Sequence, residues 1–104
     1  MRFTEEDIKR YKEVVFWHGL DYQVNHKIDE EVKEFKESIM ELFSDSDKGV
    51  DVEKECADVI NVVIGIAVVL GADPNNILGR LDEKMLREER RIDIARKTGV
   101  YVKA

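Results

Sequence analysis

The feature that most constrains this chain is an apolar run from Val59 to Leu70 that is interrupted by one polar residue, Asn61. Its many β-branched residues would also suit a strand. Buried strands, however, span about 4–8 residues, and no second convincing strand is present to pair with it. A membrane-spanning helix would need about 20 apolar residues. The run therefore predicts a buried helix from Val52 to Leu70, with Asp51 as its N-cap.

The rest of the sequence also predicts helices, because it contains a single Pro and six Gly. Each boundary has a recognisable signal: acids in a first turn, a capping side chain, a Gly stop or a Pro at the first position. An apolar stripe at heptad-like spacing marks the second helix (Ile28, Val32, Phe35, Ile39 and Leu42). The expected helices run from Thr4 to His18, from between Asp21 and His26 to about Phe43, from Val52 to Leu70, and from Pro74 to about Arg91. Ser44–Gly49 is expected to form a loop, and a turn with a short extended piece is expected in the tail from about residue 96.

The fold class expected is all-α, a four-helix bundle in a single domain of residues 1–104. The apolar share is 43%, too high for a disordered chain, and the charged share is 38%, too high for a membrane protein. A helix that is apolar nearly all round should be buried nearly all round, and one short chain offers too few partners to cover it. We therefore expect a homodimer or homotetramer to complete the bundle.

Charge and cysteine content exclude several classes of protein. The net charge is −6, which disfavours nucleic-acid binding through a broad basic surface. The single cysteine, Cys56, excludes a scaffold of intrachain disulfides. No signal-peptide pattern is present in the charged N-terminal residues, so a cytoplasmic protein is expected.

Acidic residues next to apolar surface are the candidate site. Glu31 and Glu34 lie at the edge of the second helix's apolar stripe, while Glu55 and Asp58 precede the apolar run at helical spacing. Carboxylates beside hydrocarbon are costly unless they are paired or bind a metal, and neighbouring carboxylates repel one another. An all-oxygen set suits Mg²⁺ or Mn²⁺ rather than zinc or copper. The sequence carries neither an EF-hand pattern nor the Glu-x-x-His pairs of di-iron bundles.

The acidic, basic and aromatic residues also have simpler structural interpretations. The acids of the second helix, taken alone, fit a solvated face, and the basic run from Lys84 to Arg91 fits a solvated face with i,i+4 ion pairs. Asn61 suits either a buried amide or a ligand contact. Trp17 suits either core packing or stacking on a base.

Two acidic motifs together carry a family resemblance. Glu30-Glu31-Val32-Lys33-Glu34, followed by Glu55-Cys56-Ala57-Asp58, resembles the signature of the MazG-like all-α nucleoside triphosphate pyrophosphohydrolases. That superfamily also includes dimeric dUTPases and phosphoribosyl-ATP pyrophosphohydrolases. The resemblance extends from about Lys27 to Arg91.

The resemblance implies a Mg²⁺-dependent hydrolase, with Mn²⁺ as a possible substitute, that cleaves a nucleoside triphosphate between its α and β phosphates. It implies metal ligands on both motifs, a water-activating role for Glu30 beside the metal-bound Glu31, and substrate contacts from the later basic helix. Glu88 departs from the family pattern there. The metal ligands implied are Glu31, Glu34, Glu55 and Asp58, and the candidate substrate contacts are Trp17, Asn61, Lys84, Arg87 and Arg91. The alternatives are a phosphoribosyl-ATP pyrophosphohydrolase and a non-catalytic helical module that binds divalent ions.

Overall fold

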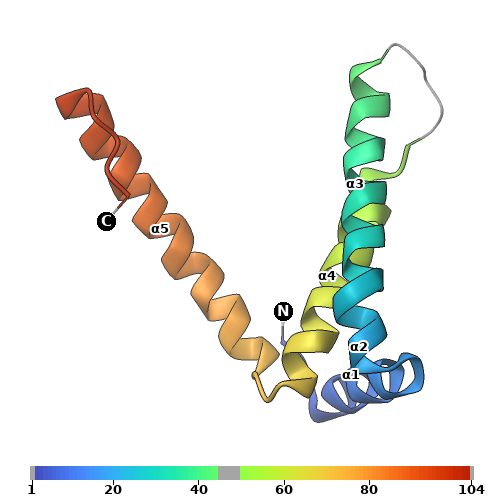
Figure 1. Ribbon diagram of the computed structural model, residues 1–104. Helices are drawn as coiled ribbons and strands as arrows, with labels where there is room; N and C mark the ends of the chain where they lie inside the picture. The colour runs from blue at the N-terminus through green and yellow to red at the C-terminus, as the bar shows by residue number, and fades with distance from the viewer. Residues whose placement is uncertain (1, 45–49, 104) are drawn as a thin grey trace. The chain divides into compact units, whose positions relative to one another are not determined.

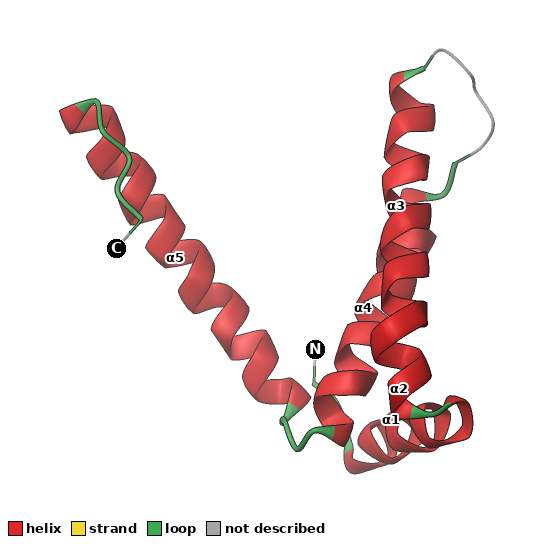
Figure 2. Cartoon of the chain, viewed as in Figure 1, coloured by secondary structure: helices red, strands yellow, loops and turns green. Residues whose placement is uncertain are grey.

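The computed structural model describes residues 2–44 and 50–103 and is helical apart from short connections (Figure 2). No strand occurs among these residues, which confirms the all-α prediction. The loop predicted over Ser44–Gly49 lies outside the described residues except for Ser44, which forms a turn. The helices are α1 (Glu5–His18), α2 (Leu20–Tyr22), the π-helix η1 (Gln23–Lys27), α3 (Ile28–Phe43), α4 (Val52–Val69) and α5 (Pro74–Thr98).

The chain divides into two compact units, Met1–Ala72 and Asp73–Ala104. The first unit contains α1 to α4, and the second contains α5 and the tail. The single domain predicted over residues 1–104 stays a prediction.

Capping side chains fix the predicted helix starts. The Thr4 hydroxyl accepts the Asp7 backbone N–H at 3.1 Å, and the Asp7 carboxylate accepts the Thr4 N–H at 2.9 Å. This reciprocal capping box satisfies two N–H groups at the start of α1 and holds the pKa of Asp7 below its usual value. Asp51 caps α4 by accepting the Lys54 N–H at 3.0 Å, as predicted. The predicted cap Asp73 likewise accepts an N–H at the start of α5.

The route into α3 departs from a simple helix start. Gly19 ends α1 with a φ of 94°, a conformation that suits glycine. Helical structure then resumes at Leu20 and passes through η1 into α3 without a break. The prediction placed this start between Asp21 and His26, slightly late. A π-turn inside a helix often marks a functional position, and this one ends at Lys27, one turn before Glu31.

Within the first unit, α3 and α4 lie side by side, and α1 packs against α4 (Figure 1). The buried apolar side chains are Val15 of α1 and Ile64 and Val68 of α4. Gly65 permits the close approach of α1, because a Cβ there would lie 3.0 Å from Val15 Cγ2. The α1–α4 contact therefore depends on a missing side chain.

A single copy of the chain does not bury the apolar helix on all sides, in keeping with the expectation that one short chain offers too few partners to cover it. On α4, Ile60 is 51% exposed and Val63 is 42% exposed. The reason is geometric: α1 and α3 cover part of the circumference of α4 and leave apolar positions uncovered.

In the second unit, α5 ends at Thr98, beyond the predicted end near Arg91, and Gly99 supplies a left-handed cap with a φ of 77°. Residues 100–103 belong to no helix or strand, and the expected short extended piece stays a prediction. The tail returns along α5 (Figure 1), where the Tyr101 hydroxyl donates to the Glu88 carboxylate at 2.7 Å. Among the described residues, no single helix has the length and apolarity to cross a membrane; α4 and α5 pass that test only when taken together.

Candidate metal centre

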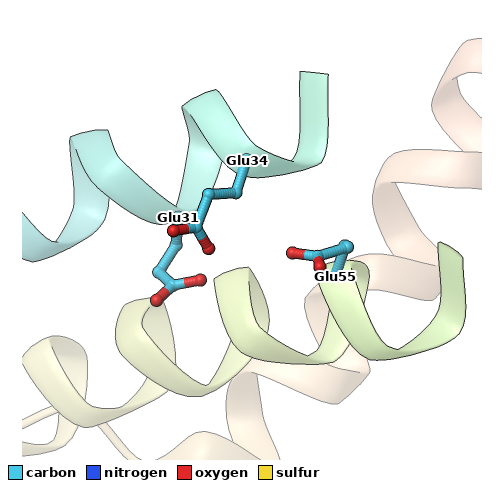
Figure 3. A group of neighbouring side chains, drawn as sticks. All are labelled: Glu31, Glu34 and Glu55. Atoms are coloured by element: carbon cyan, nitrogen blue, oxygen red, sulfur yellow. The ribbon is translucent and has the colours of Figure 1, made fainter. Parts of the chain in front are cut away.

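Three glutamates from two helices form the candidate site. Glu31 and Glu34 extend from α3, and Glu55 extends from α4 into the same space (Figure 3). One carboxylate oxygen of each lies within 4.8 Å of the others. The i,i+3 spacing places Glu31 and Glu34 on one face of α3, and the pairing of α3 with α4 brings Glu55 opposite them. The structure thus brings together three of the four predicted metal ligands.

Two of these carboxylates are buried in a way that calls for a cation. The Glu31 side chain is 8% exposed and that of Glu55 is 22% exposed. The Oε2 atom of each is buried without a hydrogen-bond partner. A buried carboxylate oxygen without a partner is costly and is rare in folded proteins. A divalent cation between the three side chains would compensate the buried negative charge of these two carboxylates.

The three carboxylates of the cluster lie close enough to repel one another. The Glu31 carboxylate raises the pKa of Glu34 above its usual value, with smaller contributions from partial burial and from Glu30 and Glu55. Lys27 partly offsets this charge, because its Nζ lies 2.7 Å from Glu31 Oε1. That hydrogen bond raises the pKa of Lys27 in turn. Lys54 Nζ also lies 3.6 Å from Glu55 Oε1. Three carboxylates thus have two ammonium groups nearby, which leaves the cluster with a net negative charge.

The donor set fits magnesium. All three candidate ligands are carboxylate oxygens, which hard divalent cations prefer, and Mg²⁺ typically takes one or two protein carboxylates with water and substrate phosphates completing its octahedron. Glu31, Glu34 and Glu55 are thus the side chains that would hold the ion.

The other two predicted acids lie beside the cluster. Asp58, one turn after Glu55, accepts a hydrogen bond from Lys54 Nζ at 2.9 Å and is not part of the three-glutamate group. Glu30 is half exposed, and its Oε1 lies 3.6 Å from Lys27 Nζ. The roles of Asp58 as a ligand and of Glu30 as a water-activating group stay predictions.

The first unit also contains a cavity of about 420 Å³, which none of the three glutamates lines. It lies between α1, η1 and α4, and Lys27 lines it while also contacting Glu31. Its volume falls in the range of about 300–1,000 Å³ that is usual for small-molecule sites. Polar and basic side chains lie among its apolar walls (Arg10, Tyr11, His18, Gln23, Lys27 and Asn61).

Asn61 and Trp17 occupy different positions relative to this cavity. Asn61 lines it and accepts a hydrogen bond from the Tyr11 hydroxyl at 2.6 Å, so its amide also joins α4 to α1. Trp17 is 83% exposed and does not line the cavity, although its ring contacts that of His18, which does.

The predicted phosphate-binding cations lie on α5, in the second unit. Lys84 and Arg87 are exposed, whereas Arg91 is half-buried and lies 3.7 Å from Glu88. Their roles as substrate contacts stay predictions.

Sequence reasoning missed Lys27 and the cavity-lining residues of α1. The spacing of Lys27 four residues before Glu31 is an i,i+4 signal for an ion pair and was available in the sequence. Arg10 and Tyr11 gave no such signal, because their place in the cavity depends on how α1 crosses α4.

Comparison with known proteins supports the same interpretation. The family model described as phosphoribosyl-ATP pyrophosphohydrolase (PRA-PH) matches residues 2–85, which include all three clustered glutamates. No curated protein and no solved structure matches the chain. The PRA-PH family lies within the MazG-like superfamily, so the family resemblance is confirmed. The chain therefore belongs to the phosphoribosyl-ATP pyrophosphohydrolase family and is a hydrolase that acts on an acid anhydride.

Proposed function

We propose that this protein is a Mg²⁺-dependent phosphoribosyl-ATP pyrophosphohydrolase, which releases pyrophosphate by cleaving between the α and β phosphates. The observation that carries the proposal is the cluster of Glu31, Glu34 and Glu55, with its two buried, unpartnered oxygens. The family match over residues 2–85 supports phosphoribosyl-ATP as the substrate.

The cluster accounts for the chemistry that such a reaction requires. A bound divalent ion neutralises phosphate charge and lowers the pKa of a bound water. Glu31, Glu34 and Glu55 would hold the ion, Mg²⁺ or Mn²⁺, and Asp58, whose carboxylate contacts Lys54 in the structure, would be the fourth ligand. Glu30, which is half exposed at the edge of the cluster, orients the attacking water and accepts its proton.

The remaining contacts belong to the organic part and the phosphates of the substrate. The cavity beside Lys27 has the volume and the mixed lining that a nucleoside needs. Asn61 presents its amide there, and Trp17 stacks on a base at the edge of the site. Lys84, Arg87 and Arg91 bind phosphate oxygens.

A nucleoside triphosphate is the second candidate substrate. One observation favours it: the two acidic motifs, Glu30-Glu31-x-x-Glu34 and Glu55-x-x-Asp58, are the pattern that resembles the MazG-like enzymes. Both candidates present the same anhydride to the metal and differ in the organic group that the cavity must accept.

We also propose that the protein works as a homodimer or homotetramer. Among its described residues, the first unit buries three hydrophobic side chains, Val15, Ile64 and Val68, while Ile60 and Val63 of its most apolar helix remain exposed. A second copy packed on α4 would cover them.

A substrate panel tests the proposed function. The protein is incubated with Mg²⁺ and either phosphoribosyl-ATP or each nucleoside triphosphate, and pyrophosphate and orthophosphate are measured separately. We expect pyrophosphate, the highest kcat/KM for phosphoribosyl-ATP, and no activity in EDTA. Metal-dependent stabilisation without turnover would instead support a non-catalytic module that binds divalent ions.

Variants link the activity to the site. Glu31→Gln should lower kcat by about 100-fold or more, because it removes the most buried ligand. Glu37→Gln, on the exposed face of the same helix, is the matched control and should retain activity. Equal activity of the two variants would overturn the assignment of the metal centre.

A further inference from the structure

Lys27 lies at the boundary between the glutamate cluster and the cavity. Its Nζ is 2.7 Å from Glu31 Oε1 and 3.6 Å from Glu30 Oε1. The same side chain lines the cavity between α1, η1 and α4 and is 31% exposed. The Lys27 ammonium can therefore reach either the acidic cluster or the cavity.

The acidic side of this boundary is the place that a divalent ion would occupy. The Glu31 side chain is more than nine-tenths buried, and its Oε2 lacks a hydrogen-bond partner while its Oε1 contacts Lys27. An ammonium and a divalent cation on the same carboxylate repel each other strongly in a partly buried site. A divalent ion on the free Oε2 of Glu31 would therefore weaken the contact of Lys27 with Oε1, and Lys27 would weaken the binding of the ion in turn.

The cavity side offers Lys27 a second position. Arg10 and His18 also line the cavity, so the walls carry several basic groups. Asp7, which lines it as well, has its carboxylate engaged by the Thr4 N–H at the start of α1. The Asp7 carboxylate keeps its charge, but Arg10 and Lys27 together outnumber it, so the lining has a net positive charge toward an anion. A lysine ammonium on its four-carbon stem also turns easily between neighbouring positions.

We propose that Lys27 is a two-position cation that couples metal binding to phosphate binding. In the metal-free protein, Lys27 neutralises Glu31. With a divalent ion on the three glutamates, Lys27 turns into the cavity and there binds a phosphate group. This inference rests on the proposed function for the presence of the metal and assigns Lys27 a role of its own.

The proposal predicts opposite effects of one substitution on two ligands. Lys27→Met keeps the apolar stem and removes the charge. Metal affinity should rise by about five-fold or more, because the competing cation is lost. Affinity for a phosphate probe in the presence of metal should fall by about ten-fold, because a charge-assisted hydrogen bond is lost. A residue that merely stabilises the fold would weaken both.

Isothermal titration calorimetry on the full chain separates the two effects. Mn²⁺ is titrated first, and inorganic pyrophosphate is then titrated in excess Mg²⁺. Lys33→Met is the matched control, because Lys33 forms an exposed i,i+4 pair with Glu37 at 3.9 Å on the same helix. Both affinities should change by less than about two-fold in this control. Lys27→Arg, which keeps the charge, should restore pyrophosphate binding.

The Mn²⁺ and pyrophosphate affinities of Lys27→Met test the two parts of the proposal separately. Tighter Mn²⁺ binding with weaker pyrophosphate binding in Lys27→Met supports the proposal. Unchanged or weaker Mn²⁺ binding overturns the competition, and unchanged pyrophosphate binding overturns the position in the cavity. Absence of Mn²⁺ binding by the wild-type protein would refute the proposed metal centre instead, a distinct result. If circular dichroism shows that Lys27→Met does not fold, Lys27→Gln takes its place with the same criteria.

Discussion

Replacing Glu55 by Gln should stabilise the metal-free protein and abolish its stabilisation by magnesium. Oxygens of Glu55 and Glu31 lie within 4.8 Å of each other. At an effective dielectric constant of about 20, two unit charges at that separation repel by about 3 kcal/mol. Lys27 and Lys54, at 2.7 and 3.6 Å from the respective carboxylates, offset part of this repulsion. A net gain of about 1–2 kcal/mol in the free energy of unfolding is therefore expected for Glu55→Gln in EDTA.

Magnesium should reverse the order of the two proteins. A ligand at a hundred times its dissociation constant stabilises the native state by about 2.7 kcal/mol, which exceeds the roughly 1–2 kcal/mol that the variant gains in EDTA. The wild-type protein should gain this amount when Mg²⁺ is added, whereas the variant, which lacks one of three ligands, should gain little. Urea unfolding followed by circular dichroism, in EDTA and in Mg²⁺, measures both quantities.

Glu53→Gln is the control for this experiment. Glu53 also lies in the first turn of α4 but is exposed, so its loss removes the same favourable interaction with the helix dipole and no clustered charge. The reasoning would be refuted if Glu55→Gln were no more stable than Glu53→Gln in EDTA, or if it retained the full response to Mg²⁺.

Two further predictions follow from the first unit. The Glu31 carboxylate raises the native pKa of Glu34, so the repulsion between them is present above that pKa and disappears below the ordinary value of 4.5. The stability of the wild type relative to Glu34→Gln, measured in EDTA, should therefore rise as the pH falls from 7 through that range. A stability difference that stays constant with pH would contradict the shift. Gly65→Ala should be less stable than Gly79→Ala by about 1–3 kcal/mol in urea unfolding. Both variants gain helix propensity, but of the two only a Cβ at Gly65 meets a neighbour, Val15 Cγ2 at 3.0 Å. Equal stabilities would show that α1 shifts without cost.

Local signals made most of the helix boundaries predictable from the sequence. The capping side chains at Thr4, Asp51 and Asp73 act on N–H groups two or three residues away, so their effect does not depend on tertiary structure. The end of α5 was predicted too early, although Ile92 and Ile94 continue the apolar residues beyond Arg91 and Gly99 supplies the stop. The π-helix η1 has no comparable signature in residue type and was not predicted.

Helical spacing in the sequence predicted which glutamates of the candidate site share a helix face. Glu31 and Glu34 share a face of α3, and Glu55 faces them because α3 and α4 pair. Asp58 was expected in the same group, but its carboxylate lies instead in an i,i+4 contact with Lys54. The cavity lay beyond sequence reasoning, because it is formed by the crossing of α1 over α4 rather than by any one segment.

The most direct test of the metal centre is the anomalous difference density of a crystal soaked in Mn²⁺. We predict a peak between α3 and α4 within about 2.3 Å of carboxylate oxygens from Glu31, Glu34 and Glu55. A peak elsewhere, or none while these three side chains point apart into solvent, would contradict the account.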